Sequence, residues 1–135
     1  MKKIFILVIL LISMMPVFGQ EAASVKVVAY YFHGSFRCAT CHKLEQYSKE
    51  AIDQNFKAAL SSGKLEFKTI NVDEKANVHF VNDYQLYTKS LVLSLIKDGK
   101  EVKSKNLEKI WEYVGDKKKF FEYVTNEIQN FLKDL

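Results

Sequence analysis

The sequence contains few cysteines, few prolines and few glycines. Of its 135 residues, 2 are cysteine, 1 is proline and 5 are glycine. Two cysteines can form at most one disulfide within the chain. The sequence also lacks a Gly-rich phosphate-binding fingerprint, which a flavin or another nucleotide cofactor would require. We therefore expect no cofactor, and any redox chemistry is expected to depend on the two cysteines.

The N-terminus lacks an apolar run long enough for a transmembrane helix, yet it has the organisation of a secretory signal peptide. Lys2 and Lys3 precede the apolar residues 4–12, and Ser13, two methionines and Pro16 lead to the small Gly19. A membrane span needs roughly 20 apolar residues, so we expect cleavage after Gly19, with an uncleaved anchor as the alternative. The chain is therefore expected to be exported, to the periplasm or another extracytoplasmic compartment.

The remaining residues, 20–135, are expected to form one domain after the signal peptide at 1–19. These 116 residues are enough for one modest core but not for two. Without the first 19 residues, Lys+Arg falls from 20 to 18 against 16 Asp+Glu, a net charge of +2. Charges this closely balanced do not favour nucleic-acid binding. A membrane is expected to be a partner only through an uncleaved signal peptide.

The first half of this domain has the pattern of a βαβ unit. A nearly continuous β-branched and aromatic run at 25–32 predicts a central strand buried on both faces. Apolar residues three or four apart predict a helix over 41–60, and alternation predicts a second strand at 65–72. A short helical or irregular crossover is predicted at 73–87, with Asp73 and Glu74 capping its first turn. Its predicted packing face consists of Phe80, Val81 and Tyr84.

The second half has the pattern of a ββα unit. Residues 91–96 predict a third strand, and Asp98-Gly99 is typical of a type I′ hairpin to an edge strand at 101–104. A short helical stripe follows at 107–114, with Trp111 as a predicted core anchor, and a longer C-terminal stripe runs to the chain end. The order predicts an α/β fold with a central mixed sheet flanked by helices.

The two cysteines, Cys38 and Cys41, are predicted to lie where the first strand meets the first helix. Backbone N–H groups and the helix dipole favour a thiolate at a helix N-terminus, and Arg37 and His42 add nearby positive or polarisable charge. Cys38 is therefore predicted to be the attacking sulfur. Cys41, one turn further along and less exposed, is predicted to attack the resulting mixed disulfide and release the partner.

These motifs resemble those of the thioredoxin-like fold, in which a C-x-x-C pair follows a buried strand. The segments "INVDE" and "LVLSLIKDGKEV" and the C-terminal amphipathic helix extend the resemblance over the mature length. More narrowly, "AYYFHGSFRCATC" and "NLEKIWEYV" resemble the ArsF-type family, with similarity over about residues 27–131. That family consists of exported thioredoxin-like proteins described as a subunit of a nitrophenyl compound nitroreductase. The resemblance implies a two-electron relay between protein partners, from a membrane thiol reductase to another nitroreductase subunit.

Two features differ from those of ordinary thioredoxins. Thioredoxins have a cis-proline facing the cysteines, but Pro16 is the only proline here, and the position falls on Ser90 or Leu91. Because a non-proline cis bond costs about 3 kcal/mol, we predict a trans bond and no cis-proline. Thioredoxins also have a buried aspartate in the preceding strand, where this chain has Tyr31 and Phe32.

Without that aspartate, His33 is the best local candidate for a proton carrier, because its unperturbed pKa is about 6.5. A strand-end histidine hydrogen-bonded within a loop is the alternative. Partner docking is predicted to involve Phe36 and Arg37 beside the cysteines, together with Ser90 and Leu91 at the position of the missing proline. The expected partners are redox proteins.

Two other interpretations of the cysteine motif stay open. With His42, the letters read C-x-x-C-H, the signature of covalent haem attachment. The α/β pattern and the absence of methionine after residue 15 argue against haem. Alternatively, Cys38 and Cys41 with His42 could hold a thiophilic ion such as zinc, copper(I) or trivalent arsenic, as a binding module that never turns over.

Overall fold

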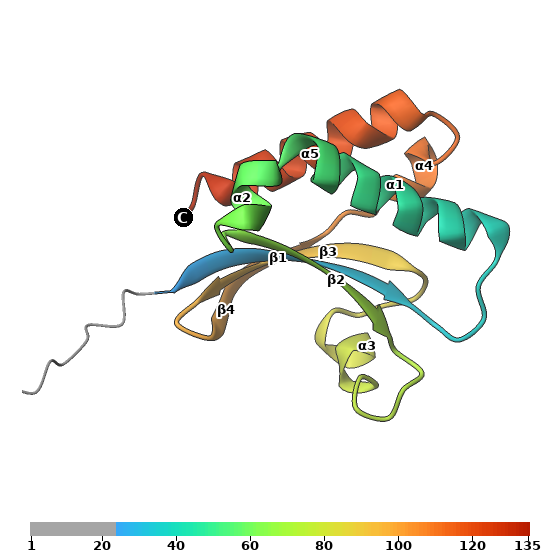
Figure 1. The fold of residues 1–135 in the computed structure, drawn as a ribbon. Coiled ribbons are helices and arrows are strands. Elements are labelled where there is room, and N and C mark those ends of the chain that lie inside the picture. The colour runs from blue at the N-terminus through green and yellow to red at the C-terminus, as the bar shows by residue number, and fades with distance from the viewer. Residues whose placement is uncertain (1–23) are drawn as a thin grey trace, which may run out of the picture.

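The structure, a computed structural model, describes residues 24–135, so the predicted signal peptide at 1–19 lies outside the described residues. These residues form a four-stranded mixed sheet with helices on both faces (Figure 1). No helix in this part of the chain is long and apolar enough to cross a membrane. The elements, in chain order, are β1 (Val25–His33), α1 (Ala39–Asn55), α2 (Lys57–Ser61), β2 (Leu65–Asn71), α3 (His79–Asp83), β3 (Ser90–Lys97), β4 (Lys100–Asn106), α4 (Ile110–Tyr113) and α5 (Lys117–Leu132).

The sheet has the strand order β2-β1-β3-β4, with β1 in the centre. β1 is parallel to β2 and antiparallel to β3, and β3 is antiparallel to β4. Consecutive residues of β1, such as Val27 and Val28, are both buried although they point to opposite faces. The predicted central strand is therefore confirmed. This βαβ unit followed by ββα, around a mixed sheet flanked by helices, is the thioredoxin-like arrangement.

The hairpin between β3 and β4 is confirmed in its predicted place. Asp98 and Gly99 have φ values of 51° and 78°, and a type I′ turn needs positive φ at both central residues. β4 is an exposed edge strand, as its low apolar content predicts.

The helix predicted over 41–60 is two helices, so that prediction is wrong in its extent. α1 ends at Asn55, and Phe56 has a non-helical backbone with φ −130° and ψ 33°. The Phe56 side chain is buried in the core, so the break turns an aromatic ring inward before α2 begins. Gly63, with φ 75°, then reverses the chain into β2.

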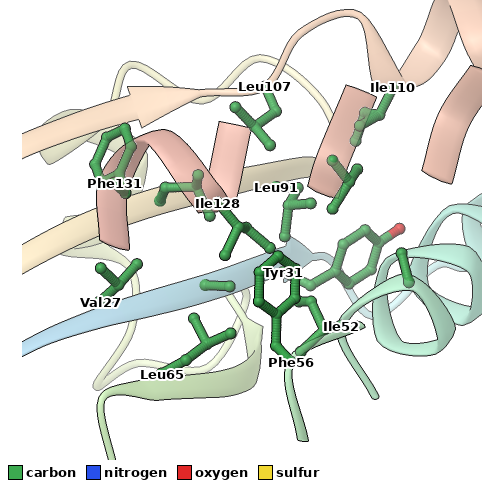
Figure 2. Close-up of a cluster of buried hydrophobic side chains, with 14 of the residues drawn as sticks. Val27, Tyr31, Ile52, Phe56, Leu65, Leu91, Leu107, Ile110, Ile128 and Phe131 are labelled. Carbon is green, nitrogen blue, oxygen red and sulfur yellow. The ribbon is translucent and has the colours of Figure 1, made fainter. Parts of the chain in front are cut away.

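The main core lies between the sheet and the helices α1 and α5 (Figures 1 and 2). β1 contributes Val27, Ala29 and Tyr31 to it, and α5 contributes its apolar stripe, Phe120, Val124, Ile128 and Phe131. Alternate residues of one strand and residues three or four apart on a helix point to one face, so the two patterns meet in a single layer.

Trp111 does not anchor this core, so that prediction is wrong. Its side chain is 36% exposed, and its indole N–H donates to the carbonyl of Lys89 at 2.9 Å. The core position in α4 is occupied by Ile110 instead. Neighbouring residues of a helix point in different directions, so Ile110 enters the core and Trp111 does not, while Tyr113 packs against the edge of the core.

The opposite face of the sheet is covered by α3 and the chain around it (Figure 1). Four aromatic rings cluster there, two from β1 and two from the α3 segment: Tyr30, Phe32, Phe80 and Tyr84. The ring centroids of Phe32 and Phe80 are 5.2 Å apart. The predicted packing of Phe80 and Tyr84 is therefore confirmed.

Candidate redox-active disulfide site

Cys38 and Cys41 are joined in a disulfide at the start of α1. Their Cα atoms are 5.0 Å apart, within the normal range for a disulfide. Cys38 caps the helix, and its Sγ accepts a hydrogen bond from the Cys41 N–H at 3.2 Å. Cys38 is half-buried, whereas Cys41 is 2% exposed. At the start of α1, Cys38 is therefore the more exposed of the two cysteines and Cys41 the more buried.

The loop before the disulfide is fixed to the chain that follows β2. The Ser35 N–H donates to Asp73 Oδ2 at 2.6 Å, and a Cβ at Gly34 would lie 2.9 Å from the same oxygen. The prediction that Asp73 caps the next helical turn is therefore wrong, because its carboxylate bonds to this loop. This contact could not be predicted from local sequence patterns, because Ser35 and Asp73 are 38 positions apart.

A buried tyrosine of β1 contacts the first turn of α1. The buried Tyr31 hydroxyl donates to the Cys41 carbonyl at 2.7 Å. Burial raises the pKa of Tyr31 to about 12, while the nearby Arg37 guanidinium acts in the opposite direction. Tyr31 is therefore a neutral donor at physiological pH. It attaches the first turn of α1 to β1.

Arg37 is held by an ion pair that sequence reasoning missed. Its guanidinium pairs with the Glu45 carboxylate on α1. The hydroxyl of Thr69 on β2 also donates to Glu45, at 3.3 Å. The available signal was weak: Glu45 follows Cys41 by four residues, so both lie on one side of the helix.

His33 ends β1 with one ring nitrogen occupied. Its Nδ1 lies 2.8 Å from the Gly34 carbonyl oxygen. A carbonyl can only accept, so Nδ1 is the donor in this contact. The contact also matches the alternative of a loop-bonded histidine. The role of His33 as a proton carrier stays a prediction.

The residues predicted for docking differ in exposure. Phe36 is 78% exposed, and the Lys89 Nζ lies 5.8 Å from the centroid of its ring. The side chains of Ser90 and Leu91 are buried, so only their backbone could contact a partner, and their role in docking stays a prediction. No cis peptide bond occurs among residues 24–135. Shortly before β3, the side chain of Tyr87 is 95% exposed.

Two shallow pockets adjoin the same segment. One, of about 200 Å³, lies between residues 85–90 and residues 106–111, with Trp111 in its wall. The other, of about 170 Å³, is lined by Phe32, His33 and part of the α3 region, together with residues 86–89. Residues 87–89 therefore separate two hollows near the exposed Phe36.

The arrangement gives no structural support to the metal-binding interpretation. His42 is exposed on the first turn of α1. In the described part of the chain, no three His, Cys, Asp or Glu side chains are grouped so that they could hold a metal ion. In this state Cys38 and Cys41 are bonded to each other.

The chain is similar to several solved structures of thioredoxins. No protein-family model and no curated protein matches the sequence. The chain is similar to a thioredoxin of Fasciola hepatica, with 20% identity, 75% of this chain and 80% of the other covered, and a TM-score of 0.41. It is also similar to oxidised mitochondrial thioredoxin 3 of Saccharomyces cerevisiae, with 14% identity, 82% and 79% covered, and a TM-score of 0.44.

Both TM-scores are below 0.5 and carry no weight here. The fold class is defined by the strand order, the connectivity and the position of the disulfide. The chain has a thioredoxin-like fold with a C-x-x-C disulfide at the start of its first helix. Such a site supports thiol–disulfide oxidoreduction.

Proposed function

We propose that the protein is an exported thiol–disulfide oxidoreductase that relays two electrons through Cys38 and Cys41 to or from a protein partner. The observation that supports this most strongly is the unequal burial of the two cysteine residues. Cys38 is half-buried at the helix N-terminus, and Cys41 is almost fully buried behind it. This is the geometry in which one sulfur attacks and the other resolves. Export is inferred from the sequence of residues 1–19 alone.

In the reducing direction, the Cys38 thiolate attacks a partner disulfide and forms a mixed disulfide. One partner sulfur leaves as a thiolate and takes a proton from solvent. The Cys41 thiol then loses its proton and attacks the Cys38 sulfur, which re-forms the intramolecular disulfide and releases the second partner thiolate. Two electrons pass from this chain to the partner, and the reverse sequence reduces the chain.

Trapping of the mixed disulfide tests this proposal. Cys41→Ser removes the resolving sulfur, so we expect a disulfide-linked complex to accumulate in the compartment to which the chain is exported. Cys38→Ser is the matched control, since it leaves a single buried sulfur that a partner cannot reach. Equal trapping by both variants, or trapping by neither, would contradict a relay in which Cys38 makes first contact.

Within this class, we propose a subunit of a nitrophenyl compound nitroreductase system. Support comes from the sequence resemblance to the ArsF-type family over about residues 27–131. The expected donor is a membrane thiol reductase, and the expected acceptor is another subunit. A nitro group takes two electrons and two protons to become a nitroso group and water, and a dithiol supplies both when it closes to a disulfide.

Reconstitution tests this narrower proposal. The reduced protein is mixed with 4-nitrobenzoate, alone and with the partner captured by Cys41→Ser. We expect loss of the nitro compound only with the partner present, in amounts that match the thiols oxidised. If the reduced chain reduces its partner but the nitro compound is not consumed, the nitroreductase role fails while the relay stands.

A further inference from the structure

Arg37 and Glu45 form the charged pair nearest in sequence to the two cysteines. Arg37 directly precedes Cys38, and Glu45 lies one turn beyond Cys41 on α1. Their side chains are 23% and 24% exposed, respectively, so neither is freely solvated. Charges in such positions are screened less by salt and water than fully exposed charges.

The pair is also connected to the body of the domain on both sides. Glu45 accepts a hydrogen bond from the Thr69 hydroxyl of β2. Arg37 lies beside the Tyr31 phenol, whose hydroxyl donates to the Cys41 carbonyl. The guanidinium therefore lies between the loop that carries Cys38 and the strand that supports Cys41, and the ion pair with Glu45 holds it there.

We propose that Arg37 and Glu45 are positioning residues that set the reduction potential of the Cys38–Cys41 disulfide in opposite directions. The inference rests on the proposed oxidoreductase function. Reduction adds two electrons and breaks the S–S bond, after which Cys41 takes one proton and Cys38 remains a thiolate. The Arg37 cation favours this new negative charge and raises the potential. The Glu45 carboxylate disfavours the thiolate and lowers the potential.

Neutral substitutions at the two positions separate these effects. Each variant is equilibrated in glutathione buffers at one pH, and the fraction of disulfide is measured by alkylation and mass. Arg37→Gln is expected to make the protein harder to reduce, and Glu45→Gln easier. Glutamine keeps an oxygen that can accept from Arg37, so Glu45→Gln changes the charge more than the anchoring.

The expected change is about three- to tenfold in the equilibrium constant with glutathione. An opposite charge within about 4–6 Å shifts a pKa by roughly 1–3 units, and we expect a smaller effect here because the two side chains are partly exposed and offset each other's charge. A tenfold change corresponds to about 30 mV for a two-electron couple.

The chain offers two controls. Glu50 lies on the same helix and pairs with Lys117 of α5, so Glu50→Gln removes a carboxylate from α1 without touching Arg37. It is expected to leave the equilibrium constant unchanged. Arg37→Lys keeps the positive charge, so its equilibrium constant with glutathione is expected to lie much closer to the wild-type value than that of Arg37→Gln. If Arg37→Gln does not fold, the difference between Glu45→Gln and Glu50→Gln decides the question.

Shifts of the same sign at positions 37 and 45, or equal shifts at positions 45 and 50, would overturn the inference. The proposed function would still stand if the wild-type protein shows a single two-electron transition. If the wild-type protein shows no such transition, the relay itself fails, and this inference fails with it.

Discussion

The two faces of the sheet differ in the side chains that cover them and in how fully they are buried. The face under α1 and α5 is largely aliphatic and closed, with residues such as Ile52, Leu91 and Ile128 fully buried (Figure 2). The face under α3 is aromatic and only partly closed, since Tyr30, Phe80 and Tyr84 are all half-buried. α3 itself has five residues, none of them buried.

The disulfide site combines a buried part with an exposed part. Cys41 is held on the closed side, where the Tyr31 hydroxyl binds its carbonyl. Phe36, which lies two residues before Cys38, and Tyr87, which precedes β3, are exposed and lie outside the main core. We infer that the closed face fixes the resolving sulfur and that the open surface is free to fit a partner.

A matched pair of substitutions tests the difference in stability most strongly. Phe120→Ala opens a cavity in the closed core and is expected to lower the free energy of unfolding by about 3–5 kcal/mol. Phe80→Ala removes the same atoms from the half-buried face and is expected to cost about half as much. Urea unfolding at fixed pH measures both. Equal losses would show that the two faces contribute alike.

Removal of a hydroxyl group from each face gives a smaller contrast. Tyr31→Phe leaves the buried Cys41 carbonyl without its tyrosine donor and is expected to cost about 1–2 kcal/mol. Tyr84→Phe removes a hydroxyl that bonds to the exposed Glu101 and is expected to cost less. Chemical denaturation of both variants at neutral pH measures the difference, and a larger loss at Tyr84 would contradict it.

The same tyrosine predicts a dependence on alkaline pH. Burial raises the pKa of Tyr31 to about 12, whereas the unfolded chain loses its phenolic proton near pH 10. The unfolded state thus binds fewer protons above pH 10, so stability falls from about pH 10 to about pH 12. Tyr31→Phe removes this contribution, and unfolding measured from pH 9 to 11 should show a shallower decline than in the wild type. An unchanged slope would contradict the buried, neutral phenol.

The smallest expected effect concerns the loop between the closed face and the disulfide. Gly34→Ala places a methyl group against Asp73 Oδ2 and is expected to break the bond from Ser35, at a cost of about 1 kcal/mol. In an Asp73→Ala background the same change should cost less, because the clash and the bond are already gone. Thermal unfolding of the four proteins in this cycle gives the coupling, and strict additivity would contradict the contact.

Local patterns predicted much of this molecule. Continuous β-branched and aromatic residues identified β1, and Asp98-Gly99 identified the hairpin, because each pattern depends on neighbouring residues. The C-x-x-C pair was placed at a helix start, where Cys38 caps α1.

The unpredicted features depend on contacts between distant segments. Asp73 bonds to the loop at Ser35 rather than to its own helix, and Trp111 bonds to Lys89 rather than entering the core. The pairing of Arg37 with Glu45 depends on how the loop folds back over α1. Periodicity gives the face of an element, but it does not show which charged group across a loop that face will meet.

Selective alkylation tests the central claim most directly. The protein is reduced, treated briefly with iodoacetamide without denaturant, and mapped by peptide mass. Modification of Cys38 well before Cys41 is the expected result, because one sulfur is presented at the helix N-terminus and the other is buried. Faster modification of Cys41, or equal rates at both sulfurs, would contradict the division into attacking and resolving cysteines.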